Sequence, residues 1–220
     1  MEGLGKLSYD EVKAVLTAFD EKSNEQTEQP FAQLYAMSDS DLLLAYASGT
    51  QQAARILVER LMPKIRSHSY CRLGNVEDAE DVTQEAFLRL WKVASTWEED
   101  RAEVSTWLYR VVINLCNDRH RRKTLYELDT ISELADDTRS PADELDDKHR
   151  QKALYSAMLE LPVRQGLAVQ LRHIDELNNS EIAEIMDLSV EAVESLTARG
   201  KRKLMEILQI QKSEIGYTNG

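Results

Sequence analysis

Amide and basic side chains gather on the polar face of a helix that the sequence predicts over residues 104–123, VSTWLYRVVINLCNDRHRRK. Asn114, Asn117 and Asp118 come first, and residues 119–123 form a cationic end. Amides can donate to and accept from base edges, while Arg and Lys attract phosphate. The pattern therefore indicates nucleic-acid binding. Its alternative is a solvated basic helix end whose charges suit the helix dipole.

A row of carboxylates and one amide marks the polar face of a second predicted helix, over residues 76–93. Its members are Asp78, Asp81, Gln84 and Glu85. A rigid acidic face suits a basic partner surface, and a solvated face is the alternative. Because no His follows at i+3 or i+4, the spacing of a di-iron site is missing. The sequence predicts no catalytic residue, no metal site and no cofactor.

The loop between these two helices, residues 94–103, carries an aromatic side chain, Trp97. An aromatic residue beside a basic helix can stack on an unpaired base. The alternative is that Trp97 packs on its own domain, and the two roles are compatible.

Two short helices with a tight turn are predicted towards the C-terminus, in NNSEIAEIMDLSVEAVESLTARGKRKL. We expect Asn179 or Ser180 to cap the first helix and residues 187–189 to form the turn. This is the pattern of a helix-turn-helix, whose second helix enters the major groove of DNA. That helix is expected to end in four basic residues that suit phosphate, Arg199, Lys201, Arg202 and Lys203. An isolated helical hairpin is the alternative.

Apolar residues at helical spacing predict the elements that position these side chains. In the 104–123 helix they are Val104, Trp107, Leu108, Val111, Val112 and Leu115. Few Gly and Pro, and no alternating apolar run, indicate an all-α fold of two small helical domains joined by a flexible acidic linker. The predicted segments are an N-terminal extension at 1–37, domains at 38–123 and 148–210, the linker at 124–147 and a tail at 211–220.

Two acidic segments, and not the predicted binding surfaces, carry the net charge of −12. Residues 1–30 hold seven acids against three Lys, and residues 124–147 hold nine acids against one Arg. Together these two segments account for the whole net charge. The remainder is neutral, so its basic clusters are available to nucleic acid. Cys71 and Cys116 lack metal-ligand spacing, and the sequence predicts neither a signal peptide nor a membrane span. We therefore expect a cytoplasmic protein.

Four runs, taken together, resemble RNA polymerase sigma factors of the extracytoplasmic-function (ECF) class: AEDVTQEAFLRLW, STWLYRVVINLCNDRHRR, LP at 161–162 and SEIAEIMDLSVEAVESLTARGKRKL. The resemblance covers about Asp39 to Leu208, and the order and spacing of the runs make it specific. It implies a sigma region 2 domain at 38–123 and a sigma region 4 domain at 148–210. It also implies a bacterial, non-enzymatic transcription initiation factor, of a class associated with stress responses, that binds core RNA polymerase.

The resemblance implies a role for each candidate residue. Docking on the beta-prime subunit would use Asp78, Asp81, Gln84 and Glu85. The melted minus-ten strand would be held by Trp97, Asn114, Asn117 and Asp118, with Arg121 and Arg122 on nearby phosphate. The minus-thirty-five duplex would be read by Arg172, Glu194, Ser195, Ala198, Arg199, Lys201 and Arg202.

The sequence also departs from the family at the proposed reading helix. Glu194 and Leu196 stand where many members carry basic residues, so the promoter sequence does not transfer from relatives. The resemblance implies the polymerase beta and beta-prime subunits, promoter DNA and an anti-sigma factor as partners. Two rival hypotheses are a stand-alone helix-turn-helix regulator, which leaves the acidic helix unexplained, and a helical metalloenzyme or hydrolase, which lacks a ligand or nucleophile motif. Residues 1–30 are interpreted as either a docking arm or a frayed extension.

Overall fold

A computed structural model describes residues 33–98, 102–129 and 153–214, and helices are the only regular elements within these ranges. The predicted N-terminal extension up to residue 32, residues 130–147 of the predicted linker and residues 215–220 lie outside them. The elements are α3 (Asp39–Ala47), α4 (Gln51–Leu73), α5 (Val76–Val93), the 3₁₀ helix η1 (Ala94–Thr96), α6 (Val104–Asp129), a helical segment at 153–159, α8 (Val163–His173), α9 (Asn179–Met186) and α10 (Val190–Glu214).

The first unit packs α3, α5 and α6 around α4. Its helices begin where polar side chains can accept from the otherwise unpaired first amide groups, as Ser38 does for α3 and Asn75 does for α5. Gly74 ends α4 in the left-handed conformation, at φ 67°, which glycine adopts without a Cβ clash. Fully buried side chains such as Leu57, Leu90 and Leu108 form the core, each contributing about 1.5–3 kcal/mol by leaving water.

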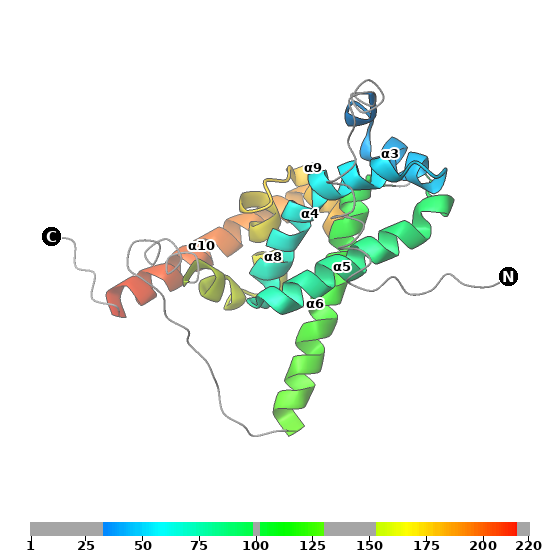
Figure 1. Ribbon diagram of the computed structural model, residues 1–220. Coiled ribbons are helices and arrows are strands. Elements are labelled where there is room, and N and C mark those ends of the chain that lie inside the picture. The colour runs from blue at the N-terminus through cyan, green and yellow to red at the C-terminus, as the bar shows by residue number, and fades with distance from the viewer. Residues whose placement is uncertain (1–32, 99–101, 130–152, 215–220) are drawn as a thin grey trace, which may run out of the picture.

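The predicted nucleic-acid helix is longer than expected. The sequence suggested an end at Lys123, whereas α6 continues to Asp129, so the first six residues of the predicted linker are helical. The added residues, TLYELD, contain good helix formers and neither Gly nor Pro, and nothing in them stops the helix. Figure 1 shows the far end of α6 extending away from the rest of the bundle.

The second unit packs the 153–159 segment, α8, α9 and α10 together, with Ala157, Val169 and Ile207 among its buried side chains. The helices α8 and α10 meet at Gly200, where a Cβ would lie 2.6 Å from Val169 Cγ2 and 2.9 Å from the backbone oxygen of Gln165. Only a residue without a side chain allows this approach.

The two units share one apolar core. Leu167, Ile182 and Val193 of the second unit belong to the same buried cluster as Leu57 and Leu108 of the first. The helices α6 and α9 are in direct contact. The sequence predicted two domains separated by a linker, and their packing against one another is a feature that it did not indicate.

Candidate functional site

The acidic face of α5 keeps the four predicted residues together. Asp81 is exposed, while Asp78, Gln84 and Glu85 are partly exposed. Glu85 pairs with Arg89 one turn further along the helix, at 2.8 Å. All four side chains are therefore at least partly exposed on the outer side of α5.

One cation from the neighbouring helix reaches this acidic face. Arg119 of α6 donates through Nη1 to Asp78 and through Nη2 to Asp81, the latter at 3.2 Å. Burial alone would lower the pKa of Arg119, but its hydrogen bonds to Asp81 and Asp78 raise it. The sequence placed Arg119 in the cationic end of the nucleic-acid helix, and the structure places it with the acidic face.

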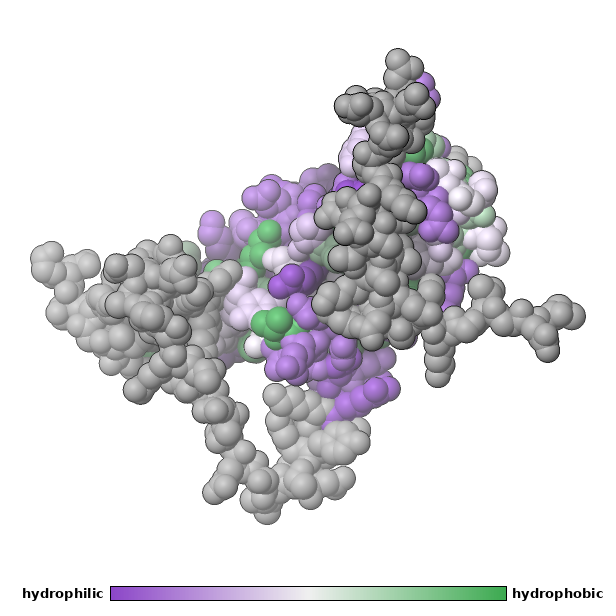
Figure 2. All heavy atoms as spheres, in the orientation of Figure 1, coloured by the Kyte–Doolittle hydropathy of each residue, from purple (hydrophilic) through white to green (hydrophobic). Residues whose placement is uncertain are grey.

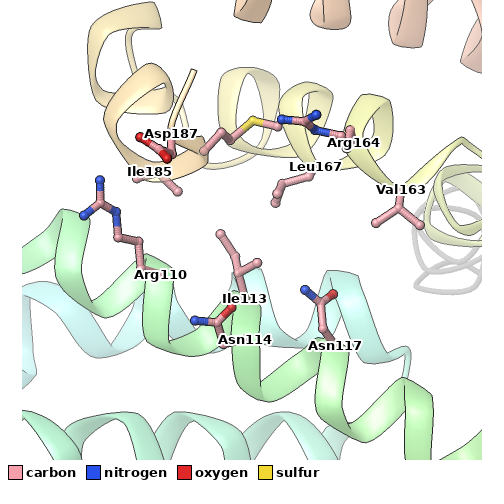
Figure 3. Close-up of a pocket in the computed structure, with 10 residues that line it drawn as sticks. Arg110, Ile113, Asn114, Asn117, Val163, Arg164, Leu167, Ile185 and Asp187 are labelled. Carbon is pink, nitrogen blue, oxygen red and sulfur yellow. The ribbon is translucent and has the colours of Figure 1, made fainter. Parts of the chain in front are cut away.

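The amide side chains of α6 lie beside a cavity of about 370 Å³ between α6, α8 and α9. Figure 3 shows Arg110, Ile113, Asn114 and Asn117 along α6, opposite residues of α8 and α9. Asn117 Oδ1 accepts from Arg72 Nη2 of α4 at 3.1 Å, which orients the amide. Asn114 is exposed and lines this cavity, and its side chain makes none of the side-chain hydrogen bonds found among the described residues.

Within the cationic end of α6, Arg121 and Arg122 are exposed, whereas Arg119 and His120 are partly buried. Asp118 accepts from Arg121 at 2.7 Å across one helical turn, and Arg122 is exposed. Figure 2 shows hydrophilic surface where the described part of α6 leaves the bundle. Such a surface suits a polyanion, because exposed ion pairs between neighbouring turns are weak and easily exchanged.

Trp97 packs on its own unit. Its ring meets Trp107 edge-on, with centroids 6.2 Å apart, and its Nε1 donates to Ser40 Oγ at 3.4 Å. The ring remains partly exposed. Packing and base stacking are therefore compatible at this position.

The helix-turn-helix is formed by α9, the turn at 187–189 and α10. The cap of α9 is Asn178, not Asn179 or Ser180. Asn178 Oδ1 accepts from two backbone amides, and the backbone N–H of Asn178 donates to the carboxylate of Glu181. The second helix was expected to end in its basic residues, but α10 continues to Glu214 and carries them in its middle. Asp187 takes the left-handed conformation, at φ 53°, in the turn.

The predicted reading residues share an exposed stretch of α10. Those exposed are Glu194, Ser195, Ala198, Arg199, Lys201 and Arg202. Glu194 accepts from Asn179 Nδ2 of α9 at 3.2 Å, which holds its carboxylate at the junction of the two helices. Arg199 donates only to the carbonyl of Ser195, one turn back along α10, at 3.2 Å among the described residues. Arg172 donates to the carbonyl of Leu177 at 2.9 Å and so braces the loop before α9.

Sequence reasoning missed two features at the junction of the units. Arg110 donates through Nε to the carbonyl of Glu184 at 3.2 Å. It lies four residues before Asn114, and this helical spacing could have placed it on the same face of the helix. His68, Gln170 and Asp175 form a buried polar cluster. The sequence indicates this cluster only weakly: His68 follows Ile65 by three residues, which places it on the apolar side of α4.

Two family descriptions match the chain, Sigma-70 region 2 over residues 57–125 and Sigma-70 region 4 over residues 151–204. Among similar proteins, the ECF RNA polymerase sigma factor SigW of Bacillus subtilis is 33% identical, over 73% of this chain and 91% of its own length. The ECF RNA polymerase sigma factor SigM of Mycobacterium tuberculosis is 28% identical, over 86% of this chain and 90% of its own.

Solved structures agree with these matches. CnrH, solved in complex with the cytosolic domain of CnrY, is 25% identical with a TM-score of 0.60, over 78% of this chain and 97% of its own. The sigma factor RpoE of Bartonella quintana, solved with the anti-sigma factor NepR, has 18% identity and a TM-score of 0.57, over 70% of this chain and 94% of its own, and so shares the fold.

The chain therefore belongs to the ECF class of RNA polymerase sigma factors, in the sigma-70 family. Proteins of this family are transcription initiation factors. Among the described residues, no helix is long and apolar enough to cross a membrane, and no group of His, Cys, Asp and Glu has the arrangement of a metal site.

Proposed function

We propose that this protein binds core RNA polymerase in the cytoplasm and directs it to promoters. In this proposal the unit at 38–123 acts as region 2 and the unit at 148–210 acts as region 4. The observation that carries it is the combination of surfaces on one chain. The acidic face of α5 and the amide face of α6 belong to one unit, and an exposed helix-turn-helix belongs to the other.

Each surface has one task. The acidic face of α5 (Asp78, Asp81, Gln84 and Glu85) docks on a basic surface of the beta-prime subunit. The α6 face and the loop of Trp97 hold the melted minus-ten strand, with Arg121 and Arg122 on phosphate. The minus-thirty-five duplex is read by α10, mainly through Ser195, Ala198 and Arg199, with Arg172 in support. Catalysis of RNA synthesis belongs to the polymerase.

An anti-sigma factor is the further partner that this proposal includes. The sigma factor RpoE, which shares the fold, has been solved with the anti-sigma factor NepR, and CnrH has been solved with the cytosolic domain of CnrY. The test is to purify the protein from its native cells before induction and identify the proteins that accompany it. Recovery only as free protein, or with core polymerase alone, in every growth condition would contradict this part of the proposal.

Reconstituted transcription tests the main proposal and separates it from a stand-alone regulator. Purified core polymerase and this protein are mixed with fragmented genomic DNA, and the 5′ ends of the transcripts are sequenced. We expect discrete start sites that require both proteins. A stand-alone regulator would bind DNA yet give no new start sites with core polymerase.

Charge reversal on α5 tests the docking surface. Asp81→Arg with Glu85→Arg should remove polymerase binding and leave the helical content unchanged, since exposed substitutions change stability by about 0.5 kcal/mol or less. Glu59→Arg with Glu206→Arg is the matched control, because both acids are exposed on other helices, where Glu59 accepts from Arg55 and Tyr35 and Glu206 accepts from Lys203. If the α5 variant stays folded and still co-purifies with the polymerase, the docking assignment is wrong.

A further inference from the structure

The end of α4 is fastened to the middle of α6 through one residue, Arg72. Arg72 Nη2 donates to Asn117 Oδ1 at 3.1 Å, and the backbone oxygen of Arg72 accepts from His120 Nε2 at 2.8 Å. That oxygen is available because α4 ends at Leu73, and the last four carbonyls of a helix have no partner within it. Two residues of α6, three positions apart, therefore hold the same residue of α4.

The guanidinium of Arg72 has few acceptors. Its Nε is buried without a hydrogen-bond partner, and Asn117 Oδ1 is the only acceptor found for the guanidinium among the described residues. Burial lowers the pKa of Arg72 from its ordinary value, yet an arginine stays charged near pH 7. Since an unpaired buried donor is costly, we expect this cation to keep its bond to Asn117.

The bond fixes which way round the Asn117 side chain lies. An arginine side chain can only donate, so the amide oxygen has to face Arg72 and the amide nitrogen has to point elsewhere. Asn117 is exposed, and its Nδ2 makes none of the side-chain hydrogen bonds found among the described residues. The group that Asn117 offers to a partner is therefore an N–H₂ donor, while its oxygen is engaged by Arg72.

Asn114, about one turn earlier on the same helix, supplies the contrast. Its side chain has no such partner among the described residues. Figure 3 shows both amides on the side of α6 that faces the cavity. An amide that is free to turn about its last bond can offer either its oxygen or its nitrogen to a base. Of the two amides, Asn117 is the one that is fixed to discriminate.

We propose that Arg72 positions Asn117 as a donor, and that Asn117 thereby selects a keto base, guanine or thymine, at one position of the melted minus-ten strand. This inference rests on the proposed function, because it takes the α6 face as the surface that holds this strand. Guanine O6 and thymine O4 accept hydrogen bonds, whereas adenine and cytosine carry an amino donor at the equivalent ring position. Opposite an amino group, the Asn117 N–H₂ meets a second donor and stays unpaired.

The strength of one hydrogen bond sets the size of the selection. A neutral hydrogen bond contributes a factor of about 2–10 in affinity. We expect the native holoenzyme to bind a keto base about fivefold more tightly than an amino base at this position. Arg72 is a positioning residue, since it acts through Asn117. Its loss should therefore change the preference at one position, whereas a merely structural defect would weaken binding of every strand equally.

The first experiment finds the position that Asn117 faces. Native and Asn117→Leu holoenzymes, each made with core polymerase, select from a pool of short single-stranded DNA of random sequence, and the bound strands are sequenced. One position should lose its base preference in Asn117→Leu while the others keep theirs. Asn114→Leu is the matched control, since it removes an amide from the same helix and should leave that preference intact. If no position loses its preference in Asn117→Leu, the proposal is wrong.

The second experiment compares strands that differ in one group at that position. Hypoxanthine against adenine, and uracil against cytosine, exchange a keto for an amino group at nearly constant size, and fluorescence anisotropy gives the affinities. Native and Arg72→Lys holoenzymes should prefer the keto base about fivefold, since lysine also only donates. Arg72→Leu frees the amide and should reduce the preference to less than about twofold.

Asn117→Asp reverses the polarity of the same contact. One carboxylate oxygen remains on Arg72, and the other can only accept, so this variant should prefer the amino base. Repulsion between the new carboxylate and strand phosphates weakens binding of both strands alike and cancels in their ratio. A keto preference that persists in Asn117→Asp would overturn the proposal.

Circular dichroism and polymerase binding confirm that each variant is folded. Where Arg72→Leu does not fold, Arg72→Gln takes its place, because glutamine accepts as well as donates and so leaves both orientations of Asn117 open. A full keto preference in the folded Arg72 variant would also overturn the proposal.

The same measurements distinguish a failure of this inference from a failure of the proposed function. Holoenzyme that binds the selected strand and starts transcription, yet keeps its keto preference without Arg72, refutes the positioning role alone. Native protein that gives neither strand selection nor transcripts with core polymerase refutes the assigned function.

Discussion

Arg199 and Asn114 occupy different units, and the proposal gives them different tasks. Arg199→Ala should weaken binding of the minus-thirty-five duplex by about 1–3 kcal/mol, the range for a lost bidentate base contact. Asn114→Ala should leave the duplex unaffected and weaken binding of a melted minus-ten strand. Both are measured by fluorescence anisotropy on the polymerase holoenzyme.

Arg199→Lys is the matched variant for the duplex measurement. Lysine keeps the positive charge but lacks the planar fork that pairs with guanine, so it should behave like alanine if Arg199 reads a base. If Arg199→Lys instead binds the duplex as tightly as the native protein, Arg199 contacts only phosphate. An exchange of the two phenotypes between Arg199 and Asn114 would reverse the assignment of the units.

The two thiols are chemically quiet in the folded protein. Burial raises the pKa of Cys71 and of Cys116 to about 12, so both are neutral thiols near pH 7. We expect neither to react with iodoacetamide at pH 8 until denaturant is added, as mass spectrometry would show. Stoichiometric alkylation of the native protein would contradict the burial of these residues.

The same pKa shifts predict a loss of stability at high pH. The folded state keeps two protons that the unfolded state releases above about pH 9, so these thiols support the fold fully below pH 9. Their contribution should disappear as the pH rises from about 9 to 12. Denaturant titrations across this pH range would measure the free energy of unfolding of the native protein and of a Cys71→Ala, Cys116→Ala variant. The free energy of the native protein should fall more steeply with pH than that of the variant.

At the scale of elements, the crossing of α8 and α10 depends on glycine. Alanine is the better helix former by about 1 kcal/mol, yet Gly200→Ala should destabilise the second unit by about 1–3 kcal/mol through overpacking. The reason is the 2.9 Å approach of its Cβ to the backbone oxygen of Gln165, which cannot rotate away. Urea unfolding followed by circular dichroism measures the change.

Gly166→Ala supplies a graded comparison on the facing helix. Its Cβ would meet the backbone oxygen of Met158 at 3.3 Å, a tighter contact than usual but one that a small shift relieves. We therefore expect a smaller loss than at Gly200. Equal losses at both positions would indicate that the crossing adjusts freely and that Gly200 has no special role.

The sequence predicted helix types well and helix ends less well. The apolar spacing from Val104 to Leu115 corresponds to a helix whose buried side chains include Leu108 and Val112. The ends of α6 and α10 were placed too early because charge patterns, and not breaking residues, were taken as the limits. The cap of α9 was missed by one residue, since three consecutive candidates, Asn178, Asn179 and Ser180, share the chemistry of a cap.

The candidate residues were predictable as separate surfaces but not as a connected arrangement. Helical periodicity indicates which side of a helix faces outward, and it placed Asp81 and Asn114 correctly on polar faces. It carries no information on which helices meet, because that depends on tertiary packing. The pairing of Arg119 with Asp78 and of His68 with Asp175 therefore required the structure.

For the whole molecule, a shared apolar core predicts shared unfolding. Leu167 and Ile182 of the second unit are buried with Leu57 and Leu108 of the first, so separation of the units exposes apolar surface on both. The free protein should unfold in a single calorimetric transition. Asp175→Ala should divide it into two, whereas Glu184→Ala should not. Two transitions in the native protein would mean that the units unfold independently.

Arg119 has a consequence for the order in which partners bind. It holds Asp78 and Asp81 from α6, and a basic group on a docked polymerase would compete for the same two carboxylates. Displaced from them, its guanidinium becomes a free cation two residues beyond Asn117, where a strand phosphate can take the place of the acids. Thermodynamic reciprocity then requires each partner to increase the affinity of the other by the same factor. Exchange of one ion pair would thus make polymerase docking and strand capture mutually reinforcing.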